Sequence, residues 1–468
     1  MSDVSHGVNA SKTNNGAITP VSVDTGVHFV VGTAPVQMVN GKVNEVIMAS
    51  SYKEAVQALG YSDDWKKYSL CEEIYTAFTL FNSAQVFFVN VLDPKKHKKT
   101  VDETQIDVVD GQIVLPAEAI AGSVEITGKT AGEDYEVFYS DTNCVVEFLK
   151  ETTGKLTVKY DAVDASQVTK SDIIGGYSVS THKTTGLELI NNVFPLYTKV
   201  PDLILCPNWS HDAEVAAVMS AKAENINGLF EGEAILDIDC TAETGATYYT
   251  EVPAWKKQKN FTKRTEVVCF PKVALGDRVF NLSTQLAASM SAVDNAEEYG
   301  GGTPCESASN KGIQADRMVT ADGSEVVMDI QQANYLNENG VVTALNFFNG
   351  FVSWGNTDVT DYFYCINRMF KWVAKTLILT YWNYIDRGIK RRLIDAVVQS
   401  INDWLASLAT DEKIIGGRVE FNESENSTSQ LAAGIVRFHI YMTPPSPMQK
   451  MDFVLEYDLS YLAALVAA

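Results

Sequence analysis

A few residues could do chemistry, beginning with a cysteine beside a glycine-rich loop. Cys305 follows loop 300–304 and could act as a nucleophile if His211 or His439 served as its base. Neither histidine lies in a local motif that suggests a Cys–His pair, and the chain has only six histidines. Consecutive glycines can also cradle a phosphate, but no Gly-Lys-Ser/Thr follows these. The pattern favours a structural loop that needs positive φ or serves an interface.

A metal site is the second chemical possibility. Asp237 and Asp239 alternate with Ile238, so both carboxylates share one face of a predicted strand, as metal ligands can. No further carboxylate or histidine completes a ligand set, and a solvated strand end is favoured. The seven cysteines are scattered without a C-x-x-C pair, which indicates small buried hydrophobes. We therefore expect no catalytic centre, no metal and no cofactor.

Composition limits the partners. The 468 residues include 37 Lys and Arg against 59 Asp and Glu, a net charge of −22 that disfavours binding to nucleic acid or anionic membranes. No apolar run is long enough to insert into a membrane, and residues 1–16 lack the apolar core of a secretory signal. We expect a protein that is made in a cytoplasm and leaves it only by lysis or a dedicated machine.

Hydrophobic periodicity predicts the elements that would position these residues. After a polar arm over residues 1–20, strands alternate with helices, which predicts a parallel-rich α/β sheet, while residues 100–169 show only short alternating segments typical of an inserted β module. Helices are predicted at 52–59, 71–81, 211–227, 284–299, 360–384 and 390–408, and strands at 86–92, 203–206, 234–238, 266–270, 418–421 and 435–442.

Apolar residues alternate with polar ones near both ends of the chain, as in β-strands. The first of these segments follows the polar arm over residues 1–20, and the second precedes the last few residues. Such terminal strands suit β-augmentation, in which one chain completes the sheet of another, although pairing within the same subunit is the alternative. The apolar residues concerned are Val21, Val23, Val27, Phe29 and Val31 near the start, and Met451, Phe453, Val454, Leu455 and Tyr457 near the end.

One basic cluster stands out against the acidic background. Lys390, Arg391 and Arg392 occupy the first turn of a predicted helix, where the helix dipole disfavours each positive charge by about 0.3–1 kcal/mol. Intramolecular pairing with Asp386 and Asp395 would offset this, and so would an acidic surface on a partner.

The last quarter of the chain resembles a known family. Its ordered motifs are similar to the C-terminal domain of contractile tail sheath proteins from myophages and phage-tail-like particles. They are Phe-Val-Ser-Trp-Gly-Asn-Thr at 351–357, Asn-Arg-Met-Phe-Lys-Trp-Val at 367–373 and Thr-Leu-Ile-Leu-Thr-Tyr-Trp at 376–382, followed by matching segments at 391–395, 416–421 and 437–445. Upstream, segments 31–35 and 304–312 resemble the family less sharply.

The resemblance implies a multidomain α/β and α+β fold. It would comprise an inner sheath domain formed from N- and C-terminal parts, a middle α/β domain, an inserted all-β domain and terminal strand-forming arms. The boundaries we expect are 1–31 for the N-terminal arm and linking strand, 32–99 for the first part of the core, 100–169 for the insertion, 170–345 for the middle domain, 346–450 for the inner domain and 451–468 for the C-terminal linking strand.

The resemblance also implies a function. Sheath subunits polymerise as stacked rings around an inner tail tube, linked by exchanged terminal strands, and contract to drive the tube through a cell envelope. The implied partners are further copies of the chain, the tube protein, and the baseplate and tail terminator proteins, in a virion tail or a phage-tail-like particle. The tube contact would involve Lys390, Arg391 and Arg392.

Two other classes compete with this interpretation. An α/β hydrolase with a β insertion would use Cys305 or an Asp-bound metal, and would form a small oligomer. A surface-layer polymer would also assemble, but it needs an export signal. Long tubes or rings in negative-stain electron micrographs would distinguish a sheath from the enzyme.

Overall fold

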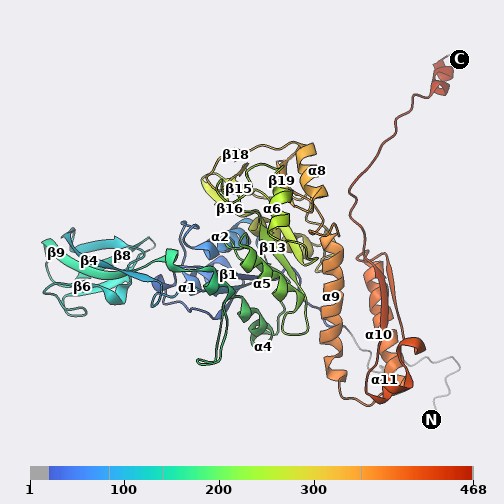
Figure 1. Cartoon of the computed structure of the whole chain (residues 1–468), viewed down its shortest axis with the longest axis horizontal. Coiled ribbons are helices and arrows are strands. Elements are labelled where there is room, and N and C mark those ends of the chain that lie inside the picture. The colour runs from blue at the N-terminus through green and yellow to red at the C-terminus, as the bar shows by residue number, and fades with distance from the viewer. Residues whose placement is uncertain (1–19, 84, 141, 349, 466–468) are drawn as a thin grey trace, which may run out of the picture.

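A computed structural model of the chain describes residues 20–465, except 84, 141 and 349. Figure 1 shows a β module at one end, an α/β core in the middle, and two long helices with a projecting C-terminal tail at the other end. The predicted arm over residues 1–20 lies almost wholly outside the described residues.

The core is built on a six-stranded sheet. Its order is β14-β13-β12-β1-β3-β2, and all neighbours are parallel except β2 and β3. Buried, nearly continuous apolar runs form the parallel strands, because both faces of a parallel sheet are covered, whereas the antiparallel edge strand β2 is partly exposed. Their bounds are β1 His28–Gly32, β2 Val46–Ala49, β3 Val86–Asn90, β12 Leu203–Leu205, β13 Glu233–Asp237 and β14 Glu266–Cys269. The predicted parallel-rich sheet is confirmed.

The pairing of β1 corrects two predictions. Phe29 and Val31 lie in β1, which pairs with β12 on one side and β3 on the other, so neither edge is free for a strand of another subunit. Val27 is buried just before it. The assignment of Val27, Phe29 and Val31 to an exchanged strand is therefore wrong. Strands from the predicted segments 32–99 and 170–345 also share this sheet, so those segments form one unit rather than two.

Helices pack against the sheet. The imidazole of His28 on β1 contacts both α2 and α7, with Nδ1 2.6 Å from Glu73 Oε1 and Nε2 3.1 Å from the Ala287 carbonyl oxygen. α5 packs against β12 and β13. The helices of this unit are α1 Tyr52–Leu59, α2 Ser69–Tyr75 with a π-helical continuation at Thr76–Leu80, α3 Lys170–Ile174, α4 Val193–Tyr197, α5 Ala213–Glu224, α6 Val252–Gln258, α7 Leu282–Asn295 and α8 Ile330–Glu338.

Three small antiparallel sheets complete the core. They are the pair β10 Gly176–Ser178 and β11 Lys183–Thr185, the pair β19 Thr343–Asn346 and β20 Phe351–Trp354, and a four-stranded sheet of β16 Arg278–Phe280, β15 Lys272–Leu275, β17 Arg317–Val319 and β18 Glu325–Val326.

Glu72 on α2 should make stability depend on pH. Its carboxylate is buried and accepts hydrogen bonds from Asn281 N at 2.6 Å and Thr284 Oγ1 at 2.8 Å. Burial raises its pKa to about 7, above the value of 4.5 for an exposed glutamate. Between these two pKa values the folded state holds a proton that the unfolded state has released. The contribution of Glu72 to the free energy of unfolding is therefore largest below about pH 4.5 and is lost as the pH rises to about 7.

Glu72→Gln removes this contribution. We expect the wild-type free energy of unfolding to fall by about 3 kcal/mol more than that of the variant between pH 4.5 and 7. Urea unfolding of both proteins at a series of pH values measures the difference. Parallel pH profiles would contradict the assignment.

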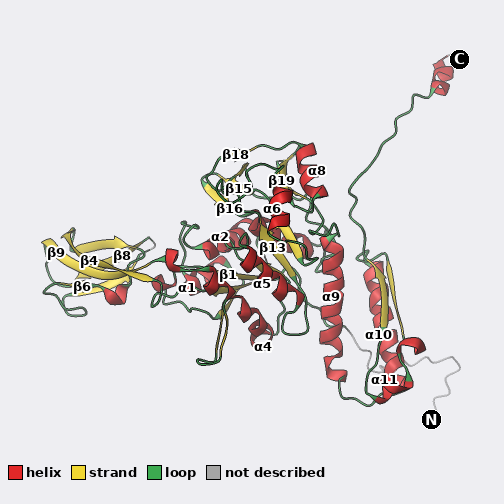
Figure 2. Cartoon of the chain, viewed as in Figure 1, coloured by secondary structure: helices red, strands yellow, loops and turns green. Residues whose placement is uncertain are grey.

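The inserted module consists of strands joined by turns, with a short 3-10 helix at Ala121–Ser123 (Figure 2). Two three-stranded sheets, β4-β9-β6 and β5-β8-β7, enclose a separate apolar cluster that includes Tyr135 and Phe148. The strands are β4 Lys98–Val108, β5 Gln112–Pro116, β6 Glu125–Ile126, β7 Tyr135–Tyr139, β8 Asn143–Phe148 and β9 Gly154–Val163. The insertion predicted at 100–169 thus occupies 98–163.

The module should be removable. Lys98 and Val163 pair at its base, so one short linker can join the two chain ends. Replacing residues 99–162 by a Gly-Ser turn should leave the core folded, because the module has its own apolar cluster. Circular dichroism melts should show a cooperative transition within about 5 °C of the wild type. Loss of cooperative unfolding would show that the core depends on the module.

The C-terminal unit follows the core. α9 Tyr364–Tyr381 and α10 Arg391–Thr410 pack with a hairpin of β21 Gly416–Glu420 and β22 His439–Thr443, with short α11 Thr428–Ala432 between the strands. The apolar cluster of this unit includes Trp372, Leu405 and also Val23 from the N-terminal segment. The predicted pair of long helices is confirmed.

The chain beyond β22 is extended, and the side chains of residues 448–462 are exposed. Residues 444–458 form no helix or strand within the chain, and a short helix follows at Leu459–Leu465. The predicted strand at 451–457 is therefore not formed in the isolated subunit. No helix in the described part of the chain is both long and apolar enough to span a membrane.

Candidate functional site

The residues considered for catalysis do not form a site. Cys305 is buried, burial raises the pKa of its thiol, and its sulfur receives a hydrogen bond from Thr303 Oγ1 at 3.3 Å. Among the described residues no hydrogen bond joins Cys305 to a histidine; the ring of His439 instead lies 3.0 Å from Glu425 Oε1. A buried thiol without a base is not an activated nucleophile.

Asp237 and Asp239, considered as metal ligands, have a structural role instead. The prediction of a solvated strand end is wrong, because both residues are buried. Asp237 is buried and accepts hydrogen bonds from Ser283 N at 3.0 Å and Ser210 Oγ at 2.8 Å, which ties β13 to the first turn of α7. Asp239 accepts hydrogen bonds from Thr241 N at 2.9 Å and Thr244 Oγ1 at 2.6 Å. No group of three or more potential ligands for a metal occurs within the described ranges.

The glycine-rich loop is also structural. Gly301 and Gly302 have φ values of +53° and +88°, which confirms the predicted need for positive φ. At Gly300 a Cβ atom would lie 2.3 Å from the Asp294 carbonyl oxygen at the end of α7. The loop therefore closes tightly on that helix end.

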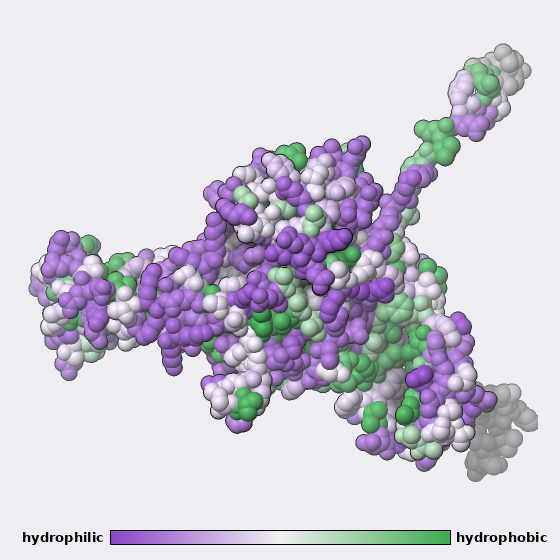
Figure 3. All heavy atoms as spheres, in the orientation of Figure 1, coloured by the Kyte–Doolittle hydropathy of each residue, from purple (hydrophilic) through white to green (hydrophobic). Residues whose placement is uncertain are grey.

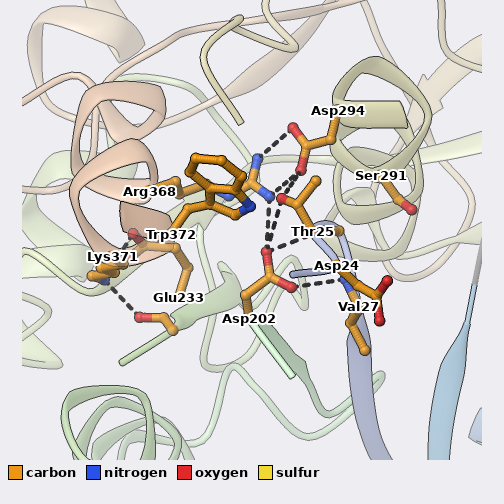
Figure 4. A network of polar contacts seen from close by, with 12 residues as sticks. Asp24, Thr25, Val27, Asp202, Glu233, Ser291, Asp294, Arg368, Lys371 and Trp372 are labelled. Carbon is orange, nitrogen blue, oxygen red and sulfur yellow. Dashed lines mark hydrogen bonds and ion pairs between the residues drawn. The ribbon is translucent and has the colours of Figure 1, made fainter. Parts of the chain in front are cut away.

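The most unusual polar cluster joins the C-terminal unit to the core (Figure 4). We call Thr25, Asp202, Asp294 and Arg368 the joint. Arg368 on α9 is buried, and its guanidinium contacts Asp202 Oδ2 at 3.1 Å and Asp294 Oδ1 at 3.0 Å. Thr25 Oγ1 donates to Asp294 Oδ2 at 2.7 Å. Four segments far apart in the sequence thus meet at one guanidinium.

The charges of the joint are balanced by a second cation. Lys375, about two turns further along α9, is buried, and with Arg368 it offsets the carboxylates of Asp202 and Asp294. Burial opposes ionisation of Asp202, but Lys375, Arg368 and two backbone N–H groups outweigh it and hold its pKa below the usual value. Burial raises the pKa of Asp294 even though Arg368 lowers it. Removing any one charge would leave a buried charge unpaired.

A second ion pair on α9 supports the joint. Lys371 Nζ lies 2.8 Å from Glu233 Oε1 on β13, and both side chains are buried. Lys371 also donates to the Gly232 carbonyl oxygen at 2.6 Å. The helix is therefore attached to the core through Arg368 and again, one turn further on, through Lys371.

An N-terminal segment completes the attachment. We call residues 21–25 the strap. Val21 N donates to Thr380 Oγ1 at 3.0 Å, Trp372 Nε1 donates to the Val23 carbonyl oxygen at 3.2 Å, and Lys375 Nζ donates to the Asp24 carbonyl oxygen at 2.7 Å. Two of the predicted linking residues, Val21 and Val23, therefore lie against α9.

Sequence reasoning did not identify the joint, although one signal was present. Arg368 lies between Tyr364 and Trp372 at four-residue spacing, on a face of α9 that the structure buries. A charged residue on the apolar face of a helix is almost never buried without a partner. The partners, however, come from residues 25, 202 and 294 and show no local pattern.

The basic cluster lies at the corner between α9 and α10. Lys390, Arg391 and Arg392 are exposed. Arg391 Nε lies 2.9 Å from Asp395 Oδ1, as the intramolecular alternative predicted, but that pair is solvent-exposed. In the described part of the chain Lys390 and Arg392 form no ion pair, so both interpretations of the cluster stay open.

The C-terminal tail presents apolar side chains to solvent. Figure 3 shows apolar and polar residues side by side along the tail. Val454 and Leu455 are 92% and 95% exposed, and Met451, Phe453 and Tyr457 are also exposed. The described part of the tail is hydrogen-bonded to the core at Gln449, whose Nε2 donates to Asn356 Oδ1 at 2.9 Å. An exposed apolar segment of this kind marks an interaction site.

The chain is similar over its full length to curated phage proteins. It is 25% identical to the "Tail sheath protein" of Burkholderia phage BcepMu over 485 aligned residues, which cover 98% of each chain. It is 24% identical to a prophage major tail sheath protein of Pseudomonas aeruginosa strain UCBPP-PA14, over 66% of this chain and 78% of the relative. The predicted resemblance to tail sheath proteins is confirmed. No family model matches the chain.

Solved structures show the same fold. The sheath of the extracellular contractile injection system PVC, in its contracted state, matches with a TM-score of 0.59 at 11% identity, over 98% of this chain and 99% of the other. The contracted helical sheath of the anti-feeding prophage gives 0.57 at 10% identity, over 98% and 100%. A sheath tail protein from Desulfitobacterium hafniense gives 0.54 at 10% identity, over 89% and 93%. The fold similarity to these sheath proteins therefore extends over 89–98% of the chain.

Proposed function

We propose that the chain is the structural subunit of a contractile sheath, which polymerises as stacked rings around an inner tube and contracts to drive the tube through a cell envelope. The similarity to tail sheath proteins over 98% of the chain carries this conclusion. The subunit acts by assembly and not as an enzyme, and the buried, unactivated Cys305 gives the hydrolase alternative no support.

The C-terminal tail is the linking strand in this proposal. Residues 451–457 have the apolar alternation of a strand but no partner within the chain, so a neighbouring subunit would supply one. The hairpin of β21 and β22 is a suitable acceptor, because a two-stranded sheet has two open edges. At the other end, Val21 and Val23 mark where the N-terminal arm reaches the subunit.

The proposal includes further partners. Lys390, Arg391 and Arg392 would contact an acidic surface of the inner tube, and the baseplate and the tail terminator would bind the two ends of the sheath. Assembly takes place in the bacterial host cytoplasm, and lysis releases the virion or phage-tail-like particle. Charge reversal of the three basic residues should abolish co-sedimentation with tubes while leaving sheath polymerisation intact.

Negative-stain electron microscopy of the purified full-length chain tests the main proposal. We expect long hollow tubes or stacked rings with a constant diameter. A homogeneous monomer or small oligomer at all concentrations would contradict it.

A further inference from the structure

The strap runs antiparallel to α9. Thr25 lies at the level of Arg368, and Val21 lies at Thr380, nearer the C-terminal end of the helix. Arg368, Trp372 and Lys375 follow one another at four- and three-residue spacing and so share one face of α9. The strap is thus held at several points along the helix.

A sharp corner separates the strap from β1. Gly26 has a φ of +66°, and a Cβ atom there would lie 2.6 Å from the Cα atom of Ser291 on α7. Gly26 N and Val27 N donate to the carboxylate of Asp202 at 3.0 and 2.8 Å, and Arg368 holds that carboxylate from the other side. The joint therefore fixes the point at which the chain turns from α9 into the core sheet.

The other linking arm leaves near the opposite end of α9. Gln449 is hydrogen-bonded to the side chain of Asn356, and the Asn356 carbonyl oxygen accepts from Tyr364 N, the first residue of the helix. The helix has 18 residues, so its ends lie about 27 Å apart. One continuous helix thus connects the exit points of the two arms.

We propose that α9 transmits tension between the two linking arms, because the strap is bound along this helix and the joint holds its end against the core. We call the contacts of Val21, Val23 and Asp24 with α9 the clamp. This inference rests on the proposed function. A pull on the N-terminal arm acts on the contacts of Val21, Val23 and Asp24 with α9 before it reaches Gly26. These contacts therefore bear the tension before it reaches β1, a central strand of the core sheet.

The clamp can be loosened without removing the joint. In the loosened variant, Trp372→Phe combined with Thr380→Val removes the indole donor to the Val23 carbonyl oxygen and the hydroxyl acceptor of Val21 N, and it leaves every charge of the joint in place. A matched control, Trp382→Phe with Thr410→Val, makes the same two changes at exposed positions.

Hydrogen exchange of the unassembled full chain tests the clamp. In the loosened variant, amides of residues 21–25 should exchange at least about tenfold faster than in the wild type, while those of β1 stay protected. The control variant should match the wild type. Unchanged exchange in the strap, or equal acceleration in β1, would overturn the proposal.

Assembled sheaths give a second measurement. Tubes of the loosened variant should break into shorter pieces than wild-type or control tubes after the same shear treatment. Equal length distributions would overturn the load-bearing role. If the wild type forms no tubes, the proposed function fails, whereas the exchange experiment still decides whether α9 holds the strap.

Discussion

Arg368→Met should lower the free energy of unfolding by about 3–5 kcal/mol, the largest effect that we expect from a single substitution. Methionine can replace the aliphatic stem of the arginine but not its charge. Asp294, which has no exposed surface, would then keep a buried carboxylate without its main partner, and Asp202 would lose one of the groups that hold it at Gly26 and Val27. Urea unfolding of the unassembled chain measures the loss.

Two comparisons separate the charge from the size of the side chain. Arg391→Met removes an arginine whose side chain is 81% exposed and paired with Asp395, and should change stability by less than about 1 kcal/mol. Arg368→Lys keeps the charge but cannot contact both carboxylates with a planar group, so an intermediate loss is expected. If Arg368→Met and Arg391→Met were equally stable, the joint would not hold the C-terminal unit.

Deleting residues 451–468 should abolish tube formation and leave the subunit folded. Among the described residues, the hydrogen bond between the tail and the core is made by Gln449, which this deletion retains, and the apolar side chains at 451–457 are exposed. The free energy of unfolding should therefore change by less than about 0.5 kcal/mol. Electron microscopy and sedimentation should show monomers where the full chain forms tubes.

Point substitutions in the tail refine this experiment. Phe453→Asp with Leu455→Asp should prevent assembly, because two carboxylates would replace apolar side chains on one face of the added strand. Asp452→Asn with Glu456→Gln changes the opposite face at nearly constant size and should leave tubes intact. Normal tubes from the deletion or from the aspartate variant would show that the tail is not the link.

The predicted helices and strands were largely correct because their signals are local. α1 coincides with its predicted range, and α9 and α10 lie within or close to theirs, since apolar residues at three- and four-residue intervals favour a helix wherever it packs. The β insertion was recognised from short alternating segments in the same way. The tail pattern at 451–457 was also read correctly as strand-like, but a strand forms only when a partner is present.

The misassigned strand shows the limit of such signals. Val27, Phe29 and Val31 were placed in an exchanged strand because they lie near a chain end and show apolar spacing. The same residues suit a buried central strand equally well, since a sequence states which residues favour extended backbone but not which strands will flank them. The pairing with β12 and β3 was decided by the tertiary fold.

By itself, then, the sequence determined the α/β class, the β insertion, the long helices of the C-terminal unit and the resemblance to sheath proteins, because each depends on patterns of neighbouring residues. The joint, in contrast, could be identified only from the tertiary structure. Thr25, Asp202, Asp294 and Arg368 are separated by up to hundreds of residues, and their charges balance only when the core, the strap and α9 are packed together. Long-range electrostatic complementarity has no local periodicity, so it becomes visible only in the folded chain.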